Sequence, residues 1–307
     1  MDSVSRRITL GIILSATLLL AGACSHDSVT TIDPSAPDEA LFQEGLSAYN
    51  AADYPTAISK FDQLLSDYPD SPRHDNAGYL SGRSRYEQLD FNGAITSLGQ
   101  MLQLHPDSPF VGAAQYYTGR SQFRLLSYAA AIPAFRASIA ADPMGVWADN
   151  AQYYVGRSIY ETGDPTGALP ELARVATDYP GSSYIDNADY YTGRCHFSLG
   201  NWSAAISAFQ DVLADASSIY ADNARYYTGR SYYYAGDLGT AMTQFQTLLD
   251  DFPTSAYVDN AIYWQVRIYV DQGDCTNANS SYSSLASGYP GGTYTSKALS
   301  YMQGNGC

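Results

Sequence analysis

Small and apolar residues recur along the chain at a fixed interval and in helical spacing. An alanine and a glycine lie five residues apart in most units, as Ala151 and Gly156 do, and glycines stand at 45, 82, 119, 156, 193 and 229. The motif DNAQYYVGR at 149–157 recurs as DNADYYTGR at 186–194 and DNARYYTGR at 222–230. The step is 37 residues, once 36, and Val266 holds the seventh place. Such self-similarity is typical of stacked repeats, so the chain predicts seven units instead of two globular domains.

Each unit contains two further landmarks that define its elements. A proline follows the glycine after 24 residues in every unit except the fifth, where Ser217 stands. Between glycine and proline lies a turn such as Gly163-Asp164 or Gly236-Asp237. Glycine suits the left-handed conformation just beyond a helix, and aspartate caps the helix that follows. Each unit is therefore predicted to be helix A, a tight turn, helix B and a proline-marked loop.

The end of the chain continues the same register. Ala298 falls 37 residues after Ala261, so 294–303 is predicted to be a final helix A that caps the array. Cys275 begins the seventh helix B and Cys307 follows the cap helix. All A–B turns share one edge in this architecture, so we expect these two cysteines to be neighbours that form a disulfide in an oxidising compartment. Cys195 occupies a small-residue position and is expected to be a buried free thiol.

The spacing of the landmarks resembles the tetratricopeptide repeat (TPR). The sixth unit carries this pattern most completely, in Ala224, Gly229, Gly236, Ala241, Phe245 and Pro253. The loop between units is longer than in the 34-residue family repeat. Its sequence, such as Tyr68-Pro69-Asp70-Ser71, resembles the repeats of periplasmic outer-membrane lipoproteins. The similar groups are the TPR subunit of the β-barrel assembly (Bam) complex and the Tol–Pal-associated periplasmic TPR protein. The resemblance implies an all-α fold, a right-handed superhelix (solenoid) of about seven helix–turn–helix repeats with a C-terminal capping helix.

The first residues read as an export signal. Arg6 and Arg7 precede an apolar stretch at 8–20, which is shorter than the roughly 20 residues of a membrane span. Small residues then lead to Cys24, as in the lipobox of bacterial lipoproteins, which implies a lipid on Cys24. Ser25 after it implies the periplasmic face of the outer membrane by the same resemblance. The expected organisation is signal peptide 1–23, lipidated polar tether 24–37, seven repeats 38–290 and capping helix 291–307.

A polar and aromatic stripe recurs on helix A at offsets 0, 3, 7 and 10, counted from the position that Asn150 holds in the fourth unit. This spacing places the stripe on one helical face. We expect helix A to line the concave side of the superhelix, so this stripe is the candidate partner-binding surface. Its candidate residues are Asn76, Tyr79, Arg83, Tyr116, Arg120, Asn150, Tyr153, Arg157, Tyr160, Asn187, Tyr190, Arg194, Asn223, Tyr226, Arg230, Tyr263 and Arg267.

Two interpretations of the stripe are open. In the first, tyrosine rings supply contact area and the arginines and asparagines bind carboxylates and carbonyls of an extended peptide or acidic segment. In the second, each arginine pairs with the acidic residue of the following unit and so joins one repeat to the next. Those acidic residues are Asp149, Asp186, Asp222 and Asp259. Both can hold together, with exposed tyrosines and shared arginines.

Composition narrows the chemistry. Asp and Glu outnumber Lys and Arg by 31 to 16, for a net charge of −15, which disfavours nucleic acid as a partner. The chain has 28 tyrosines, an excess typical of surfaces that are both apolar and wet. Four cysteines and four histidines are scattered, and no catalytic triad or phosphate-binding loop stands out. We therefore expect no enzyme, no metal and no cofactor.

The favoured function is a non-catalytic scaffold that is lipid-anchored to the outer membrane and binds envelope proteins. By resemblance, its partners belong to outer-membrane assembly, to Tol–Pal and cell division, or to secretion- and pilus-type machinery. The alternative is a lipoprotein that binds peptidoglycan or another glycan, because tyrosines with asparagine and arginine also suit sugar rings. A third, weaker interpretation, an enzyme, would require a deep cleft with perturbed ionisable groups.

Overall fold

The computed structural model of the chain describes residues 35–215 and 218–307, and these contain fifteen α-helices and no strand. In chain order the helices are α1 (Pro37–Asn50), α2 (Tyr54–Asp67), α3 (His74–Glu87), α4 (Phe91–Leu104), α5 (Val111–Arg124), α6 (Tyr128–Ala141), α7 (Ala148–Glu161), α8 (Pro165–Asp178), α9 (Ile185–Ser198), α10 (Trp202–Ala214), α11 (Ala221–Tyr234), α12 (Leu238–Asp251), α13 (Val258–Asp271), α14 (Cys275–Gly288) and α15 (Thr293–Gly304).

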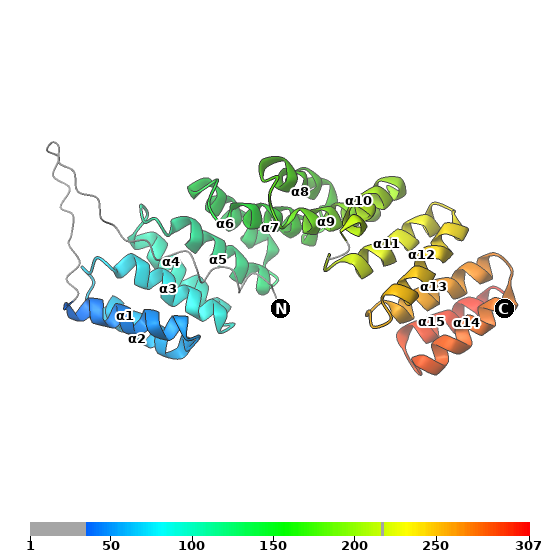
Figure 1. The fold of residues 1–307 in the computed structure, drawn as a ribbon, viewed down its shortest axis with the longest axis horizontal. Helices are drawn as coiled ribbons and strands as arrows, with labels where there is room; N and C mark the ends of the chain where they lie inside the picture. Colours follow the sequence, from blue (N-terminus) through cyan, green and yellow to red (C-terminus); the bar gives the residue numbers. More distant parts are fainter. Residues whose placement is uncertain (1–34, 216–217) are drawn as a thin grey trace.

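The helices form seven antiparallel hairpins followed by the single helix α15, which confirms the predicted solenoid. The hairpins stack into an elongated array that bends into an arch, with α1 and α15 at opposite ends (Figure 1). The odd-numbered helices up to α13 are the predicted A helices and the even-numbered helices are the B helices. Helix α1 begins at Pro37, one residue before the expected start of the first unit, because a proline is well suited to the first turn of a helix.

The A–B turns follow the predicted chemistry in the later units and depart from it in the first three. Gly163, Gly200, Gly236 and Gly273 have φ between +74° and +89°. Ala52, Leu89 and Leu126 take the same place at φ of 59°, 67° and 60°. Aspartates cap five of the B helices: Asp53, Asp90, Asp164, Asp237 and Asp274. Asn201, expected to cap α10, makes no such side-chain bond.

Replacing Gly163 with leucine should lower the free energy of unfolding by about 1–2 kcal/mol, because a side chain is strained in the left-handed region. A Cβ at Gly163 would meet no atom within 4 Å, so the backbone conformation alone sets the cost. Urea denaturation measures the change. Gly181→Leu is the matched control, because Gly181 is equally open but its φ is not positive. Equal effects of the two substitutions would contradict the conformational explanation.

Close contact between the two helices of a unit explains the glycines of helix A. A Cβ at Gly156 would lie 2.7 Å from Leu172 Cγ, and one at Gly193 would lie 2.5 Å from Phe209 Cε1. Both Leu172 and Phe209 are almost fully buried. The alanines that lie five residues before the glycine position of helix A, from Ala77 in the second unit to Ala298 in the cap, are buried as well. The interior of the array is therefore built from large side chains of helix B set against small residues of helix A.

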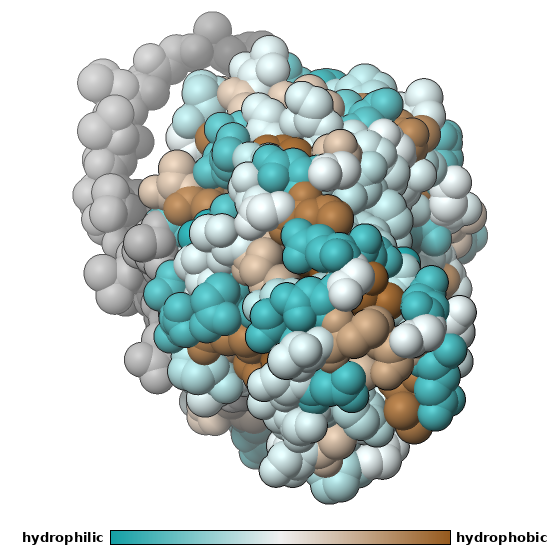
Figure 2. Space-filling view, turned by 90° about the vertical axis from the view of Figure 1, so that its right-hand side faces the viewer, coloured by the Kyte–Doolittle hydropathy of each residue, from teal (hydrophilic) through white to brown (hydrophobic). Residues whose placement is uncertain are grey.

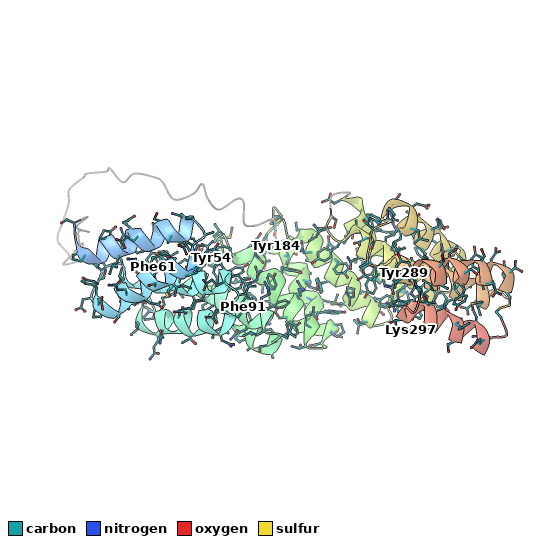
Figure 3. The ribbon with its side chains drawn as sticks, turned by 90° about the horizontal axis from the view of Figure 1, so that it is seen from below. Tyr54, Phe61, Phe91, Tyr184, Tyr289 and Lys297 are labelled. Atoms are coloured by element: carbon teal, nitrogen blue, oxygen red, sulfur yellow. A yellow bond between two sulfur atoms is a disulfide. The ribbon has the colours of Figure 1, made fainter. Side chains whose placement is uncertain are left out.

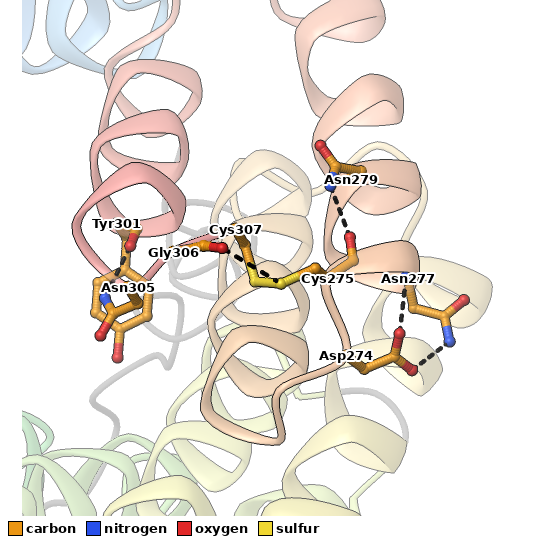
Figure 4. The surroundings of a disulfide bond; sticks show 8 residues. All are labelled: Asp274, Cys275, Asn277, Asn279, Tyr301, Asn305, Gly306 and Cys307. Carbon is orange, nitrogen blue, oxygen red and sulfur yellow. Dashed lines mark hydrogen bonds between the residues drawn. A yellow bond between two sulfur atoms is a disulfide. The ribbon is translucent and has the colours of Figure 1, made fainter.

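The C-terminal end is closed by α15 and by a disulfide. Cys275, at the start of α14, is bonded to Cys307, which follows α15 (Figure 4). Ala298 and Met302 of α15 are buried against a small apolar cluster that includes Val266 and Leu285. Seen from this end, the surface is mainly polar, and apolar residues are scattered over it (Figure 2). Helix α15 thus covers the apolar face of the seventh unit, as expected of a cap.

Removing the disulfide should loosen the cap. The bond closes a loop with a sequence separation of 32, for which chain entropy gives a stabilisation of up to about 4 kcal/mol. We expect Cys275→Ser with Cys307→Ser to increase amide hydrogen exchange in α14 and α15 and to leave α3–α10 unchanged. Adding reductant to the oxidised protein should have the same effect, and reductant should not affect the double variant. Unchanged exchange in α15 would show that packing alone holds the cap.

Candidate functional site

The tyrosines at offset 3 of helix A stack against aromatic side chains in the loop before the next helix A. Their ring centroids are 4.4–5.4 Å apart and the ring planes are 9–26° apart. The pairs are Tyr79–Phe110, Tyr116–Trp147, Tyr153–Tyr184, Tyr190–Tyr220 and Tyr226–Tyr257. Tyr263 and Tyr294 form a tilted pair at 5.4 Å in the same place. Each joint from the second unit to the cap therefore contains one such aromatic pair, whereas at the first joint Arg73 lies 4.6 Å from the centroid of the Phe42 ring.

Because of this stacking, the expectation of exposed tyrosines is wrong for five of the candidate residues. Tyr79, Tyr116, Tyr153, Tyr190 and Tyr226 are between 1% and 6% exposed. Tyr160 and Tyr263 are half-buried. Side chains fill the spaces between helices along the whole array, with Tyr184 near its middle (Figure 3). The helical period predicts the stripe correctly, and the loop aromatics that cover it also recur at the repeat interval.

The six arginines at offset 7 lie between rings of the units before and after them, and we call this set the arginine ladder. Each guanidinium carbon is 4.4–5.7 Å from a ring of the preceding unit and from a ring of the following unit. Its members with their two rings are Arg83 (Tyr49, Tyr117), Arg120 (Tyr86, Tyr154), Arg157 (Phe123, Tyr191), Arg194 (Tyr160, Tyr227), Arg230 (Phe197, Trp264) and Arg267 (Tyr233, Tyr301).

Hydrogen bonds to tyrosine hydroxyls fix most of these guanidinium groups. Arg120 Nη1 donates to Tyr116 Oη at 2.6 Å, and Arg157 Nη1 donates to Tyr153 Oη at 3.2 Å. Arg194 donates to Tyr190 of its own unit at 2.9 Å and to Tyr160 of the preceding unit at 3.0 Å. The arginines therefore do join one repeat to the next, but they do so through aromatic rings and hydroxyls.

The predicted pairing of these arginines with aspartates of the following unit is wrong. Within residues 35–215 and 218–307, no ion pair joins a ladder arginine to Asp149, Asp186, Asp222 or Asp259. The aspartate at the start of helix A instead accepts a hydrogen bond from the serine of the loop at the end of the same unit. The pairs are Asp38–Ser71, Asp75–Ser108, Asp149–Ser182, Asp186–Ser218 and Asp222–Ser255. The Tyr-Pro-x-Ser wording of the loop thus has a structural role.

Two asparagines of the stripe connect a tyrosine of the preceding unit with a tyrosine in the loop that ends their own unit. Asn150 Nδ2 donates to Tyr116 Oη at 2.7 Å and to Tyr184 Oη at 2.6 Å. Asn223 Oδ1 accepts from Tyr257 Oη at 2.7 Å and from Tyr190 Oη at 3.3 Å. Asn76 and Asn187 are half-buried at the equivalent positions. The amide side chains therefore satisfy hydroxyls that the aromatic stacking buries.

Burial controls the titration of this stripe. Desolvation raises the pKa of Tyr226 to about 12, against the influence of Arg230. Burial also raises the pKa of Tyr79, Tyr116, Tyr153 and Tyr190 above the ordinary value of 10. These five tyrosines are therefore neutral at neutral pH, which is consistent with their packing role between units.

Outside the stripe, the described residues do not meet the requirements of a reactive thiol, a metal site or a membrane span. Cys195 is a buried free thiol, as expected, and burial raises its pKa to about 12, which disfavours the nucleophilic thiolate. No group of three metal-ligating side chains occurs in residues 35–215 and 218–307. None of the described helices is long and apolar enough to cross a bilayer. Cys24, the predicted lipidation site, lies outside the described residues.

What the stripe offers to a partner is the edge of the arginine ladder. The side chains of Arg157 and Glu161 are 25% and 28% exposed, and Arg157 Nε lies 3.7 Å from Glu161 Oε1. All six ladder arginines are half-buried, so each side chain is partly exposed at the surface. A ligand could contact this edge only in addition to the interactions already made within the array.

Comparison with solved structures relates the fold to TPR proteins. A TPR protein from Cytophaga hutchinsonii is 16% identical with a TM-score of 0.67, and the match covers 84% of this chain and 99% of that one. A TPR protein from Parabacteroides merdae ATCC 43184 is 14% identical with a TM-score of 0.58, covering 87% and 98%. PilW, titled a widely conserved type IV pilus biogenesis factor, is 16% identical with a TM-score of 0.59, covering 75% and 100%.

Comparison with protein-family models shows the family to which the chain belongs. No curated protein sequence gives a match. Residues 34–126 and 111–264, which together make up more than half of the chain, match the family model YfiO, described as outer membrane lipoprotein. The matched region contains the tyrosine pairs from Tyr79–Phe110 to Tyr226–Tyr257 and five of the six ladder arginines. The chain belongs to the YfiO family of outer membrane lipoproteins, and its fold is a solenoid of tetratricopeptide repeats.

Proposed function

We propose that the protein is anchored to the outer membrane by a lipid on Cys24 and acts at its periplasmic face as a scaffold that binds envelope proteins. The family is one of outer membrane lipoproteins, and solenoids of stacked repeats present extended concave surfaces suited to binding other proteins. The observation that carries the proposal is the arginine ladder. It fixes the geometry of successive units, so the array presents one extended, preorganised surface on which partners can assemble.

We propose three envelope processes in which such a scaffold could act. Outer-membrane assembly, Tol–Pal and cell division, and secretion- or pilus-type machinery all fit a lipid-anchored solenoid. The similarity to PilW, a pilus biogenesis factor by its title, supports including the last of these. The glycan-binding alternative loses support, because the tyrosine rings on which a sugar would stack are buried in five units. Peptidoglycan therefore stays a second candidate that requires its own test.

Fractionation and co-purification test the proposal together. We expect the wild-type protein in the outer-membrane fraction and Cys24→Ala in the soluble periplasmic fraction. After crosslinking, purification of the wild type should recover defined envelope proteins in stoichiometric amounts, whereas purified peptidoglycan sacculi should retain little protein. Recovery with sacculi alone would favour the glycan alternative. Recovery in the cytosol would overturn the proposal.

A further inference from the structure

The first two hairpins line a partly open cavity that the function above does not use. It lies between α2, α3 and α4, and its volume is about 530 Å³. This size is in the range of pockets that receive small ligands or several atoms of a partner side chain. The cavity opens at the surface beside Leu104 of α4, which is 62% exposed.

A substitution within the repeat pattern explains why the cavity occurs here. Gly78, which lines it, is the only glycine at offset 2 of helix A. The other six units carry larger side chains there: Leu41, Gln115, Gln152, Asp189, Arg225 and Ile262. In the fourth unit, Gln152 Nε2 donates to Glu171 Oε2 at 2.9 Å, and Arg136 of the preceding unit donates to Glu171 Oε1 at 2.6 Å. This network joins two B helices across the A helix between them.

The three equivalent positions at the first joint are Asp62, Gly78 and Ser97, and all three line the cavity. Ser97 stands where the fourth unit has Glu171, and Asp62 stands where the third has Arg136. With a glycine and a serine in place of two long side chains, the network cannot form. The cavity is therefore the space that Arg136, Gln152 and Glu171 close with their polar side chains between the third and fourth units.

The walls of the cavity combine apolar surface with charges that cancel. Leu65, Met101 and Leu104 supply the apolar part. The carboxylate of Asp62 accepts from Arg85 Nη2 at 2.5 Å and from Ser81 Oγ at 2.6 Å, so neither charge is left unpaired.

The remaining titratable group, His74, faces His105, with 2.7 Å between Nδ1 of the first and Nε2 of the second. Burial and the neighbouring His105 lower the pKa of His74, which keeps its ring uncharged at neutral pH.

We propose that this cavity receives an uncharged side chain with an apolar body and a hydrogen-bonding end, presented by a partner protein. The apolar body would contact Leu65 and Met101, and the polar end would meet Ser97 or the exposed amide of Gln100 at the rim. A net charge on the occupant is disfavoured, because the lining offers no unpaired opposite charge. That a protein presents the side chain rests on the proposed scaffold function, and the cavity itself does not.

The first test uses p-cresol, the side chain of tyrosine as a free molecule, on the full chain with Cys24→Ser, which keeps every residue of the array and cannot be acylated. We expect saturable binding in the millimolar range by saturation-transfer NMR, and at least tenfold weaker binding of 4-methylbenzoate and 4-methylbenzylamine. Ser97→Gln should weaken p-cresol binding at least tenfold, because it restores a long side chain at the position of Glu171.

Two further variants make this result specific. Ser66→Gln fills the cavity from the opposite wall and should have the same effect as Ser97→Gln. Ser207→Gln, at an exposed site on helix α10, should leave binding unchanged. A Cβ at Gly78 would lie only 3.1 Å from Met101 Cβ, so Gly78 is left unaltered. Absence of p-cresol binding, or equal binding by Ser97→Gln, would overturn the proposal.

A second test identifies the source of the occupant. A photo-crosslinking residue at Gln103, on the rim, should form a protein adduct in cells, and the adduct should disappear when Ser97→Gln is added. Persistence of the adduct in that variant would count against the cavity as the docking point. Outer-membrane fractionation of Ser97→Gln should match the wild type, so failure of the cavity proposal is distinguishable from failure of lipid anchoring.

Discussion

Raising the pH above 10 should unfold the array, with a steep dependence on pH. The five buried tyrosines of the aromatic pairs have a pKa above 10 in the folded protein, and that of Tyr226 is about 12. Unfolded tyrosine loses its proton near pH 10, so above this pH the unfolded chain binds fewer protons and the free energy of unfolding falls. Each such tyrosine contributes up to about 1.4 kcal/mol per pH unit until its folded pKa is reached.

Five tyrosines acting together would lower the free energy of unfolding by up to roughly 7 kcal/mol per pH unit. We expect nearly constant stability between about pH 7 and 9 and cooperative loss of the far-ultraviolet circular dichroism of helix between about pH 10 and 12. Tyr226→Phe removes one titrating hydroxyl, so its stability should fall less steeply over the same range. The same slope in both proteins would show that Tyr226 does not titrate with unfolding.

Replacing Arg157 with alanine should lower the free energy of unfolding by about 3 kcal/mol. Its guanidinium carbon lies 4.8 Å from the Phe123 ring and 4.9 Å from the Tyr191 ring, and it also bonds Tyr153 Oη. Partly desolvated contacts of this kind are worth about 1–2 kcal/mol each. Arg157→Lys should restore little of the loss, because an ammonium group cannot lie flat between two rings. Adding Arg194→Ala should reduce stability further, by an amount that is not additive since the two residues have neighbouring rings.

Arg174→Ala is the matched control for the arginine ladder. Its side chain is 52% exposed and pairs with Asp178 at 2.8 Å, a surface ion pair expected to contribute less than about 1 kcal/mol. Thermal unfolding of the variants, with co-purification of envelope proteins below the transition, separates the two interpretations of the stripe. Loss of partner binding at unchanged stability would favour a binding groove over a structural ladder.

The repeat register made the fold predictable, whereas the contacts of the stripe were not. The glycine, alanine and proline landmarks report on packing within a hairpin, which a single unit of sequence contains. The environment of Arg157 depends on Phe123 and Tyr191, which belong to the units before and after it. An exposed stripe and a stripe buried between units have the same helical period, so the period alone could not distinguish them.

The aspartates illustrate the same limit. Opposite charge suggested Asp149 as a partner for Arg120, but Asp149 accepts a hydrogen bond from Ser182 at the end of its own unit. The loop that brings Ser182 back to Asp149 is visible in the sequence only as recurring wording. The disulfide was predictable because it depends on the edge at which both cysteines lie, a property of the whole architecture and not of side-chain contacts.

The first and last positions of the arginine ladder differ from those between them. Leu46 occupies the ladder position of the first unit, so no ring is required before it. Tyr301 of α15 lies 4.4 Å from Arg267 and supplies the ring that a following repeat would otherwise provide. A shortened protein that stops after a complete hairpin would leave its last guanidinium covered on one side only. Inserting or deleting one whole unit between these two ends should therefore leave every remaining guanidinium between two rings, whereas deleting α15 should not.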